Sequence, residues 1–359
     1  MKSVIHLITT IERGGAEKQL LILAAAQVAD GRPVSVIFLK GVPELAQDFK
    51  DAGVELILDI GNISPLKQVL KLRKILKLRS EYIIHAHLPR AELIACLAGL
   101  LVHEKIIFTR HNSEPFFPSA PKIVSHLLSR FVTRRSKLGI AISLAVKEYL
   151  LNSNEISKVF LLEVCYYGIP FDRHQVSTTK LKSKNAFAVG TISRLAPQKD
   201  LVTLILAFQL FQKNHLESEL FIVGEGPLKF ELEKLIRRLD LSDSVHLLGR
   251  LTKTSDFYQM LDVFVLSSLY EGFGLVLLEA MKEGIPVVAT KISAIPEVLG
   301  GNHILLAEVG NPQSFANMIE KCIDEGIREK VLSHQIAQLS TFSVKNLVLN
   351  MNQIYNKLT

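Results

Sequence analysis

Tryptophan is absent from the 359-residue sequence, and cysteine occurs only three times. Cys96, Cys165 and Cys322 are odd in number and lie far apart along the chain. A disulfide framework uses an even number of cysteines, and a zinc site uses closely spaced ones, so neither class fits this sequence. We therefore expect reduced thiols and a cytoplasmic protein.

Long apolar runs are also absent. The longest, residues 93–102, is bounded by Glu92 and His103, whereas a helix that crosses a bilayer needs about 18 apolar residues. The first ten residues run into Glu12 and Arg13 without a small-residue cleavage pattern, so we expect no secretory leader. Hydrophobic residues make up 48% and charged residues 21%, which excludes disorder as the main state. At roughly 100–200 residues per domain, the length predicts two domains.

Several catalytic signatures are missing as well. The sequence contains neither a Walker phosphate loop nor a nucleophile elbow. Gly224-Glu225-Gly226 begins like a dinucleotide fingerprint, but Lys229 occupies the position of the third glycine. A nicotinamide-dependent enzyme is therefore poorly supported.

A metal site is not expected either. His85 and His87 flank one alanine and have the spacing of a metal-binding pair. No cluster of cysteines or carboxylates accompanies them, however, and such clusters are typical of metal sites.

The positive charge of the chain belongs to its first half. Residues 1–180 hold 24 basic and 16 acidic side chains, whereas residues 181–359 hold 18 basic and 19 acidic ones. A local positive field of this kind can attract nucleic acid, an anionic lipid surface or an acidic substrate.

Short apolar runs alternate with helical patterns along both halves. In the first half, the expected strands are residues 3–9, 34–39, 54–58, 83–86, 106–109 and 138–142. In the second half, they are residues 186–191, 220–223, 245–248, 263–266, 286–289 and 304–306. Continuous apolar strands separated by helices indicate parallel strands buried on both faces. The right-handed crossover rule then predicts an α/β fold of two doubly wound, Rossmann-like domains facing a cleft.

A polar stretch rich in Ser, Thr and Lys separates the two halves, and we place a hinge there at residues 172–185. It divides an N-terminal domain of residues 1–171 from a C-terminal domain of residues 186–342. The amphipathic end of the chain, residues 343–359, is expected to form a terminal helix. In open parallel sheets, ligands bind at the carboxyl ends of strands, so the loops that follow strands are the candidate sites.

The strongest candidate is the segment of residues 271–280, which follows an expected strand. Gly272 and Gly274 open a helix here, and they let the backbone come close to a ligand while the helix start offers N–H groups to a phosphate. Glu271 precedes this helix and Glu279 lies about two turns along it, so both carboxylates could accept hydrogen bonds from sugar or ribose hydroxyls. The alternative is an acidic helix cap followed by a core helix.

A second candidate is the loop of residues 193–200. Arg194 and Lys199 lie five residues apart in it, and two such cations can clamp a diphosphate or stabilise one as it leaves. The alternative is a solvated loop with two surface charges.

Two loops of the first half offer further groups. Gly14 and Gly15 would present backbone N–H groups at the start of a helix, unless they simply form a tight turn. His111 lies at the carboxyl end of the expected strand 106–109, where its imidazole could hydrogen-bond a transferring group. A capping or structural histidine is the alternative.

Together, these loops resemble the retaining nucleotide-sugar glycosyltransferases of family four, which have the GT-B fold. The resemblance covers the whole chain and is most specific over residues 186–299. Glu271 and Glu279 look like the family's paired glutamates, which implies that Glu279 holds the donor ribose and Glu271 lies against the transferred sugar. Arg194 and Lys199 match the family's diphosphate clamp.

The resemblance also implies roles for other positions. The remaining donor-binding residues would be Gly14, Gly15, Glu225, Arg250, Leu251, Phe273, Gly274 and Leu275. His111 would lie near the transferred sugar, so that His111, Glu271, Arg194 and Lys199 form the catalytic set. The terminal helix would cross back onto the first domain.

Two features depart from the family pattern. The hinge segment reads Tyr167-Gly168-Ile169-Pro170 where Asn-Gly-Val-Asp is usual, and Ser267 stands where proline is usual. No position expected to bind the donor is lost, which argues against a catalytically inactive relative.

The activity implied by the resemblance is transfer of a sugar with retention of its anomeric configuration. The donor would be a nucleotide sugar, a UDP-sugar rather than a GDP-sugar, and the acceptor a glycan or lipid-linked glycan in surface polysaccharide or lipopolysaccharide assembly. No metal or other cofactor is expected, because cations and helix starts supply the positive charge. The alternatives are an epimerase or phosphorylase of the same fold, and a non-catalytic sugar- or lipid-binding module.

Two basic segments of the first half are candidates for contact with a membrane. Residues 66–79 contain six basic residues and residues 122–137 contain five, and neither segment contains an acidic one. In the second segment, the apolar residues form one helical stripe: Ile123, Val124, Leu127, Leu128 and Phe131. Such a helix can lie on an anionic membrane at the inner face of the cell, or it can be a solvated face beside a core stripe. Nucleic-acid binding is not expected, since no recognition motif accompanies the charge.

Overall fold

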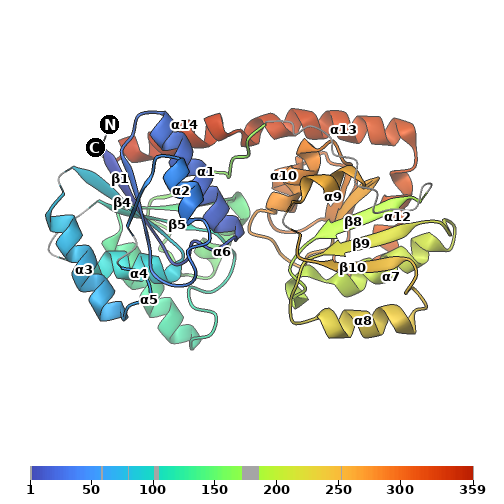
Figure 1. Ribbon diagram of the computed structural model, residues 1–359, viewed down its shortest axis with the longest axis horizontal. Coiled ribbons are helices and arrows are strands. Elements are labelled where there is room, and N and C mark those ends of the chain that lie inside the picture. Colours follow the sequence, from blue (N-terminus) through green and yellow to red (C-terminus); the bar gives the residue numbers. More distant parts are fainter. Residues whose placement is uncertain are drawn as a thin grey trace. The chain divides into compact units, whose positions relative to one another are not determined.

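The computed structural model describes residues 2–57, 60–79, 81–100, 105–171, 186–251 and 253–358. The chain forms two compact units, which are drawn in Figure 1. Unit 1 comprises Met1–Pro170 and Phe342–Thr359, and unit 2 comprises Phe171–Thr341. The expected hinge, residues 172–185, lies outside the described residues.

Unit 1 contains a parallel sheet with seven strands in the described part of the chain. The strands are β1 (Ser3–Ile8), β2 (Val34–Phe38), β3 (Glu55–Ile57), β4 (Tyr82–His87), β5 (Ile106–Arg110), β6 (Leu138–Ala141) and β7 (Leu162–Val164). Their order is β3-β2-β1-β4-β5-β6-β7, and β1 pairs with β4 so that His6 lies opposite His85. The sequence did not predict β7, because a three-residue strand at a sheet edge is too short to give a periodic signal.

Helices follow the strands of unit 1 and cover both faces of its sheet. They are α1 (Gly15–Ala29), α2 (Ala46–Asp51), α3 (Pro65–Lys77), α4 (Pro89–Ala98), α5 (Lys122–Arg135), α6 (Leu144–Asn152) and α14 (Val344–Asn356). Figure 1 shows α1 and α14 on one side of the sheet and α3, α4 and α5 on the other. Every residue of β2, β4 and β5 is therefore buried, as expected for a parallel sheet covered on both faces.

The chain returns to unit 1 through α14. The Ser343 hydroxyl caps this helix by accepting the N–H of Asn346 at 3.2 Å, which satisfies one of the free donors of the first turn. The Ile169 N–H donates to the Phe342 carbonyl at 2.8 Å. This hydrogen bond joins the end of the first segment of unit 1 to the start of its second segment. The face of α14 that packs on unit 1 buries Leu347, Met351, Ile354 and Tyr355.

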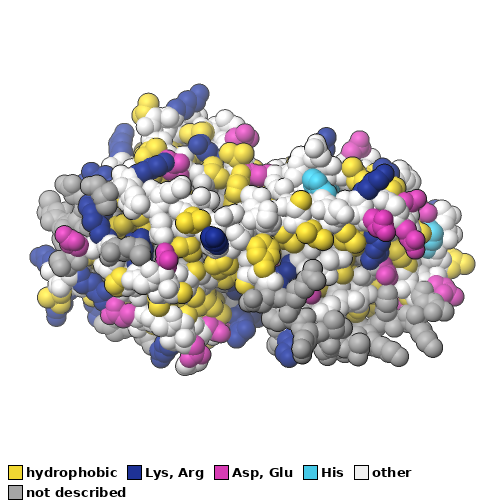
Figure 2. Space-filling model, turned by 90° about the horizontal axis from the view of Figure 1, so that it is seen from above, with side chains coloured by type: hydrophobic (Ala, Val, Ile, Leu, Met, Phe, Trp, Pro, Cys, Tyr) yellow, Lys and Arg dark blue, Asp and Glu magenta, His cyan; other side chains and the backbone are white. Residues whose placement is uncertain are grey.

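Helix α5 has an unusual distribution of side chains. Its apolar residues Ile123 and Leu127 are 75% and 60% exposed, whereas Ser125 and Ser129 are buried. Of the apolar stripe that the sequence predicted, Ile123, Val124 and Leu127 are exposed and Leu128 and Phe131 are half-buried, so the stripe faces mainly outward. On the face of the molecule drawn in Figure 2, Lys and Arg side chains are spread over unit 1.

Unit 2 contains a second parallel sheet, with six strands among the described residues. The strands are β8 (Ala188–Ile192), β9 (Glu219–Val223), β10 (Val245–Gly249), β11 (Val263–Leu266), β12 (Val287–Thr290) and β13 (Leu306–Ala307), in the order β10-β9-β8-β11-β12-β13. The helical elements are η1 (Pro197–Lys199), α7 (Leu201–Gln212), α8 (Lys229–Arg238), α9 (Ser255–Gln259), α10 (Leu275–Lys282), α11 (Ile295–Leu299), α12 (Pro312–Lys321), α13 (Glu325–Leu339) and η2 (Ser340–Phe342). None of the described helices of either unit is long and apolar enough to cross a lipid bilayer.

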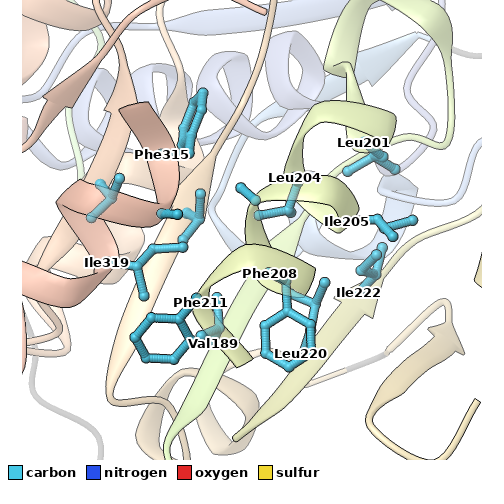
Figure 3. Packing of buried hydrophobic residues seen from close by; sticks show 14 of the residues in the cluster. Val189, Leu201, Leu204, Ile205, Phe208, Phe211, Leu220, Ile222, Phe315 and Ile319 are labelled. Atoms are coloured by element: carbon cyan, nitrogen blue, oxygen red, sulfur yellow. The ribbon is translucent and has the colours of Figure 1, made fainter. Parts of the chain in front are cut away.

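The core of unit 2 lies between its sheet and the helices α7 and α12, as Figure 3 shows. Leu204 and Phe208 of α7 pack with Ile222 of β9 and Phe315 of α12, and all four side chains are fully buried. Burial of each side chain of this size stabilises the fold by about 1.5–3 kcal/mol. This core fixes the positions at which the strands of the sheet end.

In both sheets, the strand order reverses beside the first strand of the unit. The reversal lies between β1 and β4 in unit 1 and between β8 and β11 in unit 2. Loops at the carboxyl ends of strands beside such a reversal form the usual ligand-binding crevice of a doubly wound sheet. The predicted α/β fold of two doubly wound sheets is confirmed. The loops with Gly14 and Gly15, with Arg194 and Lys199, and with Glu271 follow strands that flank these reversals, namely β1, β8 and β11.

Candidate functional site

Two loops of unit 2 meet at the carboxyl edge of its sheet. Residues 193–200 follow β8, and residues 267–274 follow β11. The Leu269 N–H donates to the Gln198 carbonyl at 2.8 Å, and the Gln198 side-chain amide donates to the Tyr270 carbonyl at 2.8 Å. The two loops that the sequence marked as the strongest candidates are therefore joined directly.

Ser267 contributes a second connection between these loops. Its hydroxyl donates to the Lys199 carbonyl at 2.8 Å, which a proline at this position could not do. The Thr290 hydroxyl of β12 donates to the Ser268 carbonyl at 2.9 Å and so supports the loop from the other side. Sequence reasoning missed the roles of Ser267 and Thr290, because a lone hydroxyl at a strand end carries no recognisable pattern.

Lys199 and Glu271 form an ion pair in this pair of loops. The Lys199 Nζ atom lies 2.5 Å from Glu271 Oε1, and the Ser268 hydroxyl donates to the same oxygen at 2.7 Å. The Glu271 side chain is 9% exposed and the Lys199 side chain 17% exposed. A carboxylate this deeply buried requires such partners, since an unpaired charge would be strongly destabilising.

Arg194 provides a second cation at the same edge of the sheet. Its side chain is exposed, and it makes no hydrogen bond or ion pair with any other residue that the structure describes. The guanidinium group therefore remains available for an anionic ligand, and its planar fork of donors suits phosphate oxygens.

The backbone of the Arg194 loop is held by a glycine pair after β9. The Leu195 N–H donates to the Glu225 carbonyl at 2.9 Å. A Cβ atom on Gly224 would lie 1.9 Å from the Ser193 carbonyl oxygen, and one on Gly226 would lie 2.3 Å from the Leu195 carbonyl oxygen. These glycines are required because two loop backbones touch, so the segment that begins like a dinucleotide fingerprint has a structural explanation.

Glu279 lies on α10, the helix that begins after the β11 loop. Gly274 precedes this helix with φ at +88°, a left-handed conformation that favours glycine. The buried Tyr258 hydroxyl donates to Glu279 Oε2 at 2.8 Å. The pKa of Tyr258 is raised, mainly because the phenol is buried and also because the Glu279 charge is close. The phenol therefore stays protonated and holds the half-buried Glu279 carboxylate in one orientation.

The other residues predicted to bind the donor in unit 2 lie along the same edge. Phe273 is buried and Leu275 is the first residue of α10. Arg250 and Leu251 directly follow β10, and Glu225 is exposed after β9. All the candidate residues of this unit thus follow four neighbouring strands, β10, β9, β8 and β11, in the order of the sheet.

The glycine pair of unit 1 begins α1. Gly14 is the N-cap without a side-chain hydrogen bond to the helix, and Gly15 is the first helical residue. A Cβ atom on Gly14 would lie 2.3 Å from Glu17 Oε2, so glycine leaves room for this acidic side chain. The Thr10 hydroxyl donates to Glu17 Oε1 at 2.5 Å. A carboxylate therefore already lies beside the positive end of the α1 dipole.

His111 follows β5, and both of its ring nitrogens face other side chains. Its Nδ1 atom lies 2.5 Å from the Tyr167 hydroxyl, and its Nε2 atom lies 3.2 Å from His87 Nδ1. Burial lowers the pKa of His111 to about 3 and raises the pKa of Tyr167 far above its ordinary value. The phenol and the imidazole are therefore both neutral, and His111 is hydrogen-bonded to Tyr167 through Nδ1 and to His87 through Nε2. His111 lies where the sequence predicted, but its nitrogens are engaged within the protein.

The hydrogen bonds of His111 continue into the core of unit 1. The chain of side chains runs from His111 through His87, His6, Gln27, Tyr355 and His85 to Thr109, with distances between 2.7 and 3.3 Å. Tyr355 belongs to α14, so the last helix of the sequence completes a network that starts at the edge of the sheet. Sequence reasoning missed His6, because only the pairing of β1 with β4 brings it beside His85.

Among the residues that the structure describes, His6, His85 and His87 form a group that could hold a metal ion. One ring nitrogen of each lies within 4.8 Å of the others. Each of their six ring nitrogens has a hydrogen-bond partner in the network described above. Burial lowers the pKa of all three, so they are neutral imidazoles, and the hydrogen bonds account for their arrangement without an ion.

Two family models match consecutive parts of the chain. The family described as Glycosyltransferase Family 4 matches residues 13–172, and the family described as Glycosyl transferases group 1 matches residues 172–338. Together they cover both units.

Curated proteins similar to this chain carry related descriptions. The capsular polysaccharide biosynthesis glycosyltransferase CapM of Staphylococcus aureus is 27% identical over 292 residues, which is 76% of each chain. The UDP-Gal:alpha-D-GlcNAc-diphosphoundecaprenol alpha-1,3-galactosyltransferase of Escherichia coli is 26% identical over 296 residues, covering 75% of this chain and 73% of its own.

Among solved structures, HepE from Anabaena in complex with UDP and glucose has the same fold. The TM-score is 0.84 at 22% identity, over 99% of this chain and all of that one. Several of the structural neighbours are glycosyltransferases, as expected for the GT-B fold.

Proposed function

The chain belongs to the family 4 glycosyltransferases, and from this premise we propose that it transfers a sugar, with retention of configuration, from a UDP-sugar to a lipid-linked glycan acceptor. The observation that carries the proposal is the junction of the two unit 2 loops beside the β8–β11 reversal. That junction brings the exposed Arg194, the Lys199–Glu271 pair and the start of α10 to one edge of the sheet.

In this proposal, the cations act on the leaving nucleotide. Arg194 and Lys199 bind the diphosphate and stabilise the negative charge that grows on it as the sugar departs. The first N–H groups of α10 add partial positive charge at the same place. With these groups present, we expect no requirement for a divalent metal ion, and full activity after treatment with EDTA would support this.

The two glutamates have different roles in the proposal. Glu279, held by Tyr258, accepts hydrogen bonds from the ribose hydroxyls. Glu271 lies against the transferred sugar, and a diphosphate bound to Lys199 changes the surroundings of Glu271 through their ion pair. Lys199 and Ser268 both hydrogen-bond to Glu271 Oε1 and so orient this carboxylate. We propose front-face attack and not double displacement, and a sugar adduct trapped on Glu271 would contradict this.

Two of the comparisons support a UDP-sugar donor. The name of the galactosyltransferase from Escherichia coli specifies UDP-galactose, and HepE has been crystallised with UDP and with UDP-glucose. Backbone groups near Arg250 and Leu251 would bind the base, so the side chains there do not indicate which base is preferred.

A lipid-linked acceptor is supported by the surface of unit 1. Helix α5 exposes Ile123 and Leu127, and helix α3 exposes Leu66 and Leu70, at 71% and 56%. Both helices carry basic residues and no acidic ones. Apolar side chains among cations are typical of a surface that lies on an anionic membrane, and we propose that the enzyme acts at the inner face of the cytoplasmic membrane.

A panel of nucleotides tests the donor site. Purified full-length protein is heated with UDP, GDP, ADP and their common sugar conjugates, and a ligand at 100 times its Kd should stabilise it by about 2.7 kcal/mol. We expect a shift with UDP and UDP-sugars that weakens in Arg194→Gln. The absence of any nucleotide response would overturn the proposal.

Transfer itself is tested with the donor that the panel selects. Radiolabelled donor and vesicles containing a diphosphopolyprenol-linked sugar should give a labelled lipid product of retained anomeric configuration. Inversion at the anomeric carbon would contradict the mechanism, and binding without transfer or hydrolysis would leave a sugar-binding module.

A further inference from the structure

Unit 1 contains a cavity of about 460 Å³ at the carboxyl edge of its sheet. It is lined by residues of the loops that follow β1, β2, β4 and β5, among them Thr9, Lys40, Arg90 and Phe116. Pocket volumes of a few hundred cubic ångströms are typical of sites for small molecules. None of the residues predicted from the sequence to bind the donor lines this cavity.

Arg90 is oriented in advance by a buried glutamine. The side-chain amide of Gln68 donates to the carbonyls of Leu39 and Ile60, so its Oε1 atom must face the other way. That oxygen accepts a hydrogen bond from Arg90 Nη2 at 3.2 Å. Gln68 is fully buried and fixes one edge of the guanidinium, and no acidic side chain in the described part of the chain forms an ion pair with Arg90.

Two polar atoms of the cavity residues lack partners. Arg90 Nε and Thr9 Oγ1 are both buried, and neither has a hydrogen-bond partner among the described residues. An unpaired buried donor of this kind costs about 1–3 kcal/mol, so most such groups in folded proteins find a partner. A ligand in the cavity would supply one for each.

Beside these polar groups, the cavity is lined by apolar side chains, and Phe116 among them is held by several contacts. Phe116 is buried, its ring lies 4.4 Å from the Arg110 guanidinium carbon, and its N–H donates to Glu155 at 2.9 Å. Leu88, directly before α4, has φ at +72°, a conformation rarely adopted by leucine. Backbone strain of this kind persists only where the surrounding structure imposes it, and it is concentrated at functional sites.

We infer that this cavity binds the phosphorylated sugar of the lipid-linked acceptor, with Arg90 and Lys40 as phosphate ligands and Thr9 as a hydroxyl ligand. This inference rests on the proposed function and names the part of the acceptor that is recognised. A phosphate accepts hydrogen bonds from the fixed guanidinium, and sugar hydroxyls can both donate and accept. Asn112 and Glu114 also line the cavity, and the Asn112 amide donates a hydrogen bond to Glu114 Oε2 at 2.9 Å. Both side chains offer further hydrogen-bonding groups for sugar hydroxyls.

The position of the cavity favours a lipid-linked form of this ligand. Pro65 lines it and begins α3, whereas Pro118 lines it a few residues before α5. The two helices that expose apolar and basic side chains therefore both start at the cavity. A phosphorylated sugar could enter it while its hydrocarbon chain stayed in a membrane beneath these helices.

Binding to vesicles tests the inference without catalysis. The full-length protein is floated with phosphatidylcholine vesicles that contain or lack N-acetylglucosaminyl diphosphoundecaprenol, a neutral bilayer being used so that general attraction to anionic lipid is absent. We expect the diphospholipid to recruit the wild type, and Arg90→Gln and Thr9→Val each to lose at least tenfold in affinity. Lys50→Gln, an exposed charge of α2 away from the cavity, is the control and should bind as the wild type does.

Thr9→Val also separates binding from folding. The Thr9 hydroxyl has no partner, so its removal should leave the melting temperature unchanged or raised while binding falls. Equal binding by Thr9→Val, Arg90→Gln and the wild type would overturn the inference. So would a preference for undecaprenol without its phosphorylated sugar.

Two further measurements identify the chemical group that the cavity binds. Competition by soluble N-acetylglucosamine 1-phosphate would show that the cavity reads the phosphorylated sugar, and failure to compete at millimolar concentration would contradict this. Stabilisation by UDP, measured on the same variants, reports the donor site independently. If UDP does not stabilise the wild type, the proposed function is contradicted. If UDP stabilises every variant normally and the variants bind the lipid as the wild type does, only the inference about the cavity is contradicted.

Discussion

The ammonium nitrogen of Lys199 lies 2.5 Å from a carboxylate oxygen of Glu271, although the two residues are 72 positions apart in the sequence. The sequence predicts one as a phosphate ligand and the other as a neighbour of the transferred sugar. Their pairing couples the two roles, because a phosphate that attracts Lys199 also changes the surroundings of Glu271. The ion pair and the Ser268 hydrogen bond also orient the Glu271 carboxylate at this edge of the sheet.

Replacement of Lys199 should impair transfer far more than it impairs folding. Lys199→Ala removes one of the two cations proposed to stabilise the departing diphosphate, and loss of one such group typically lowers kcat about 100–1000-fold. Steady-state transfer assays measure the effect, with Lys213→Ala, an exposed lysine at the end of α7, as the control. A fall in kcat of less than about threefold would remove Lys199 from the proposed mechanism.

The carboxylate of Glu279 should matter for the nucleotide and not for the acceptor. Glu279→Gln keeps an oxygen for the Tyr258 hydroxyl but loses the charge that strengthens hydrogen bonds from ribose, so we expect UDP to bind about tenfold more weakly, or about 1.4 kcal/mol. Isothermal titration calorimetry measures this, and Glu283→Gln at the end of the same helix is the matched control. Equal affinity in the two variants would contradict the ribose role.

The glycine at position 224 should be needed for folding and not for chemistry. In Gly224→Ala, the new methyl group would lie 1.9 Å from the Ser193 carbonyl, and φ at +139° is unfavourable for alanine as well. Backbone strain of about 1–2 kcal/mol and overpacking of about 1–3 kcal/mol should both lower the free energy of unfolding. Gly284→Ala has a positive φ but open space around it, so urea denaturation should show a loss of about 1 kcal/mol only.

The buried histidines of unit 1 should make the protein sensitive to acid. Burial lowers the pKa of His6 to about 4 and that of His111 to about 3, whereas an unfolded histidine titrates near 6.5. The unfolded state therefore binds more protons, so this stability is complete above pH 6.5 and is lost as the pH falls toward 4. Each buried histidine contributes up to about 1.4 kcal/mol per pH unit in that range.

Urea denaturation between pH 7.5 and 4.5 measures this dependence. The slope of the unfolding free energy against pH reports how many more protons the unfolded state binds than the folded state. In His6→Gln this number should fall by about one, even if the variant is less stable at every pH. His126→Gln, on α5 and outside the network, is the control. A slope in His6→Gln equal to that of the wild type would show that His6 is not kept neutral in the folded protein.

The sequence predicted the fold well because its signals are local. Apolar runs of four to six residues marked most strands, and the charges and glycines at their carboxyl ends marked the loops that follow β8 and β11. The outward stripe of α5 was ambiguous in the sequence, because periodicity shows that apolar residues share a face and does not show what that face contacts. Ser125 and Ser129, buried beneath it, carry no apolar signal that would have resolved the question.

By itself, the sequence determined the two doubly wound sheets, the family and the loops that hold candidate residues, since each depends on residues close together in the chain. The tertiary structure alone decided which side chains meet: Lys199 with Glu271, His111 with His87 and Tyr167, and His85 with a tyrosine 270 residues away. It also revealed Arg90, held by Gln68 at a cavity that no motif marks. Hydrogen bonds and ion pairs require atoms within about 3 Å of each other, and strand order and packing, not spacing in the sequence, set those distances.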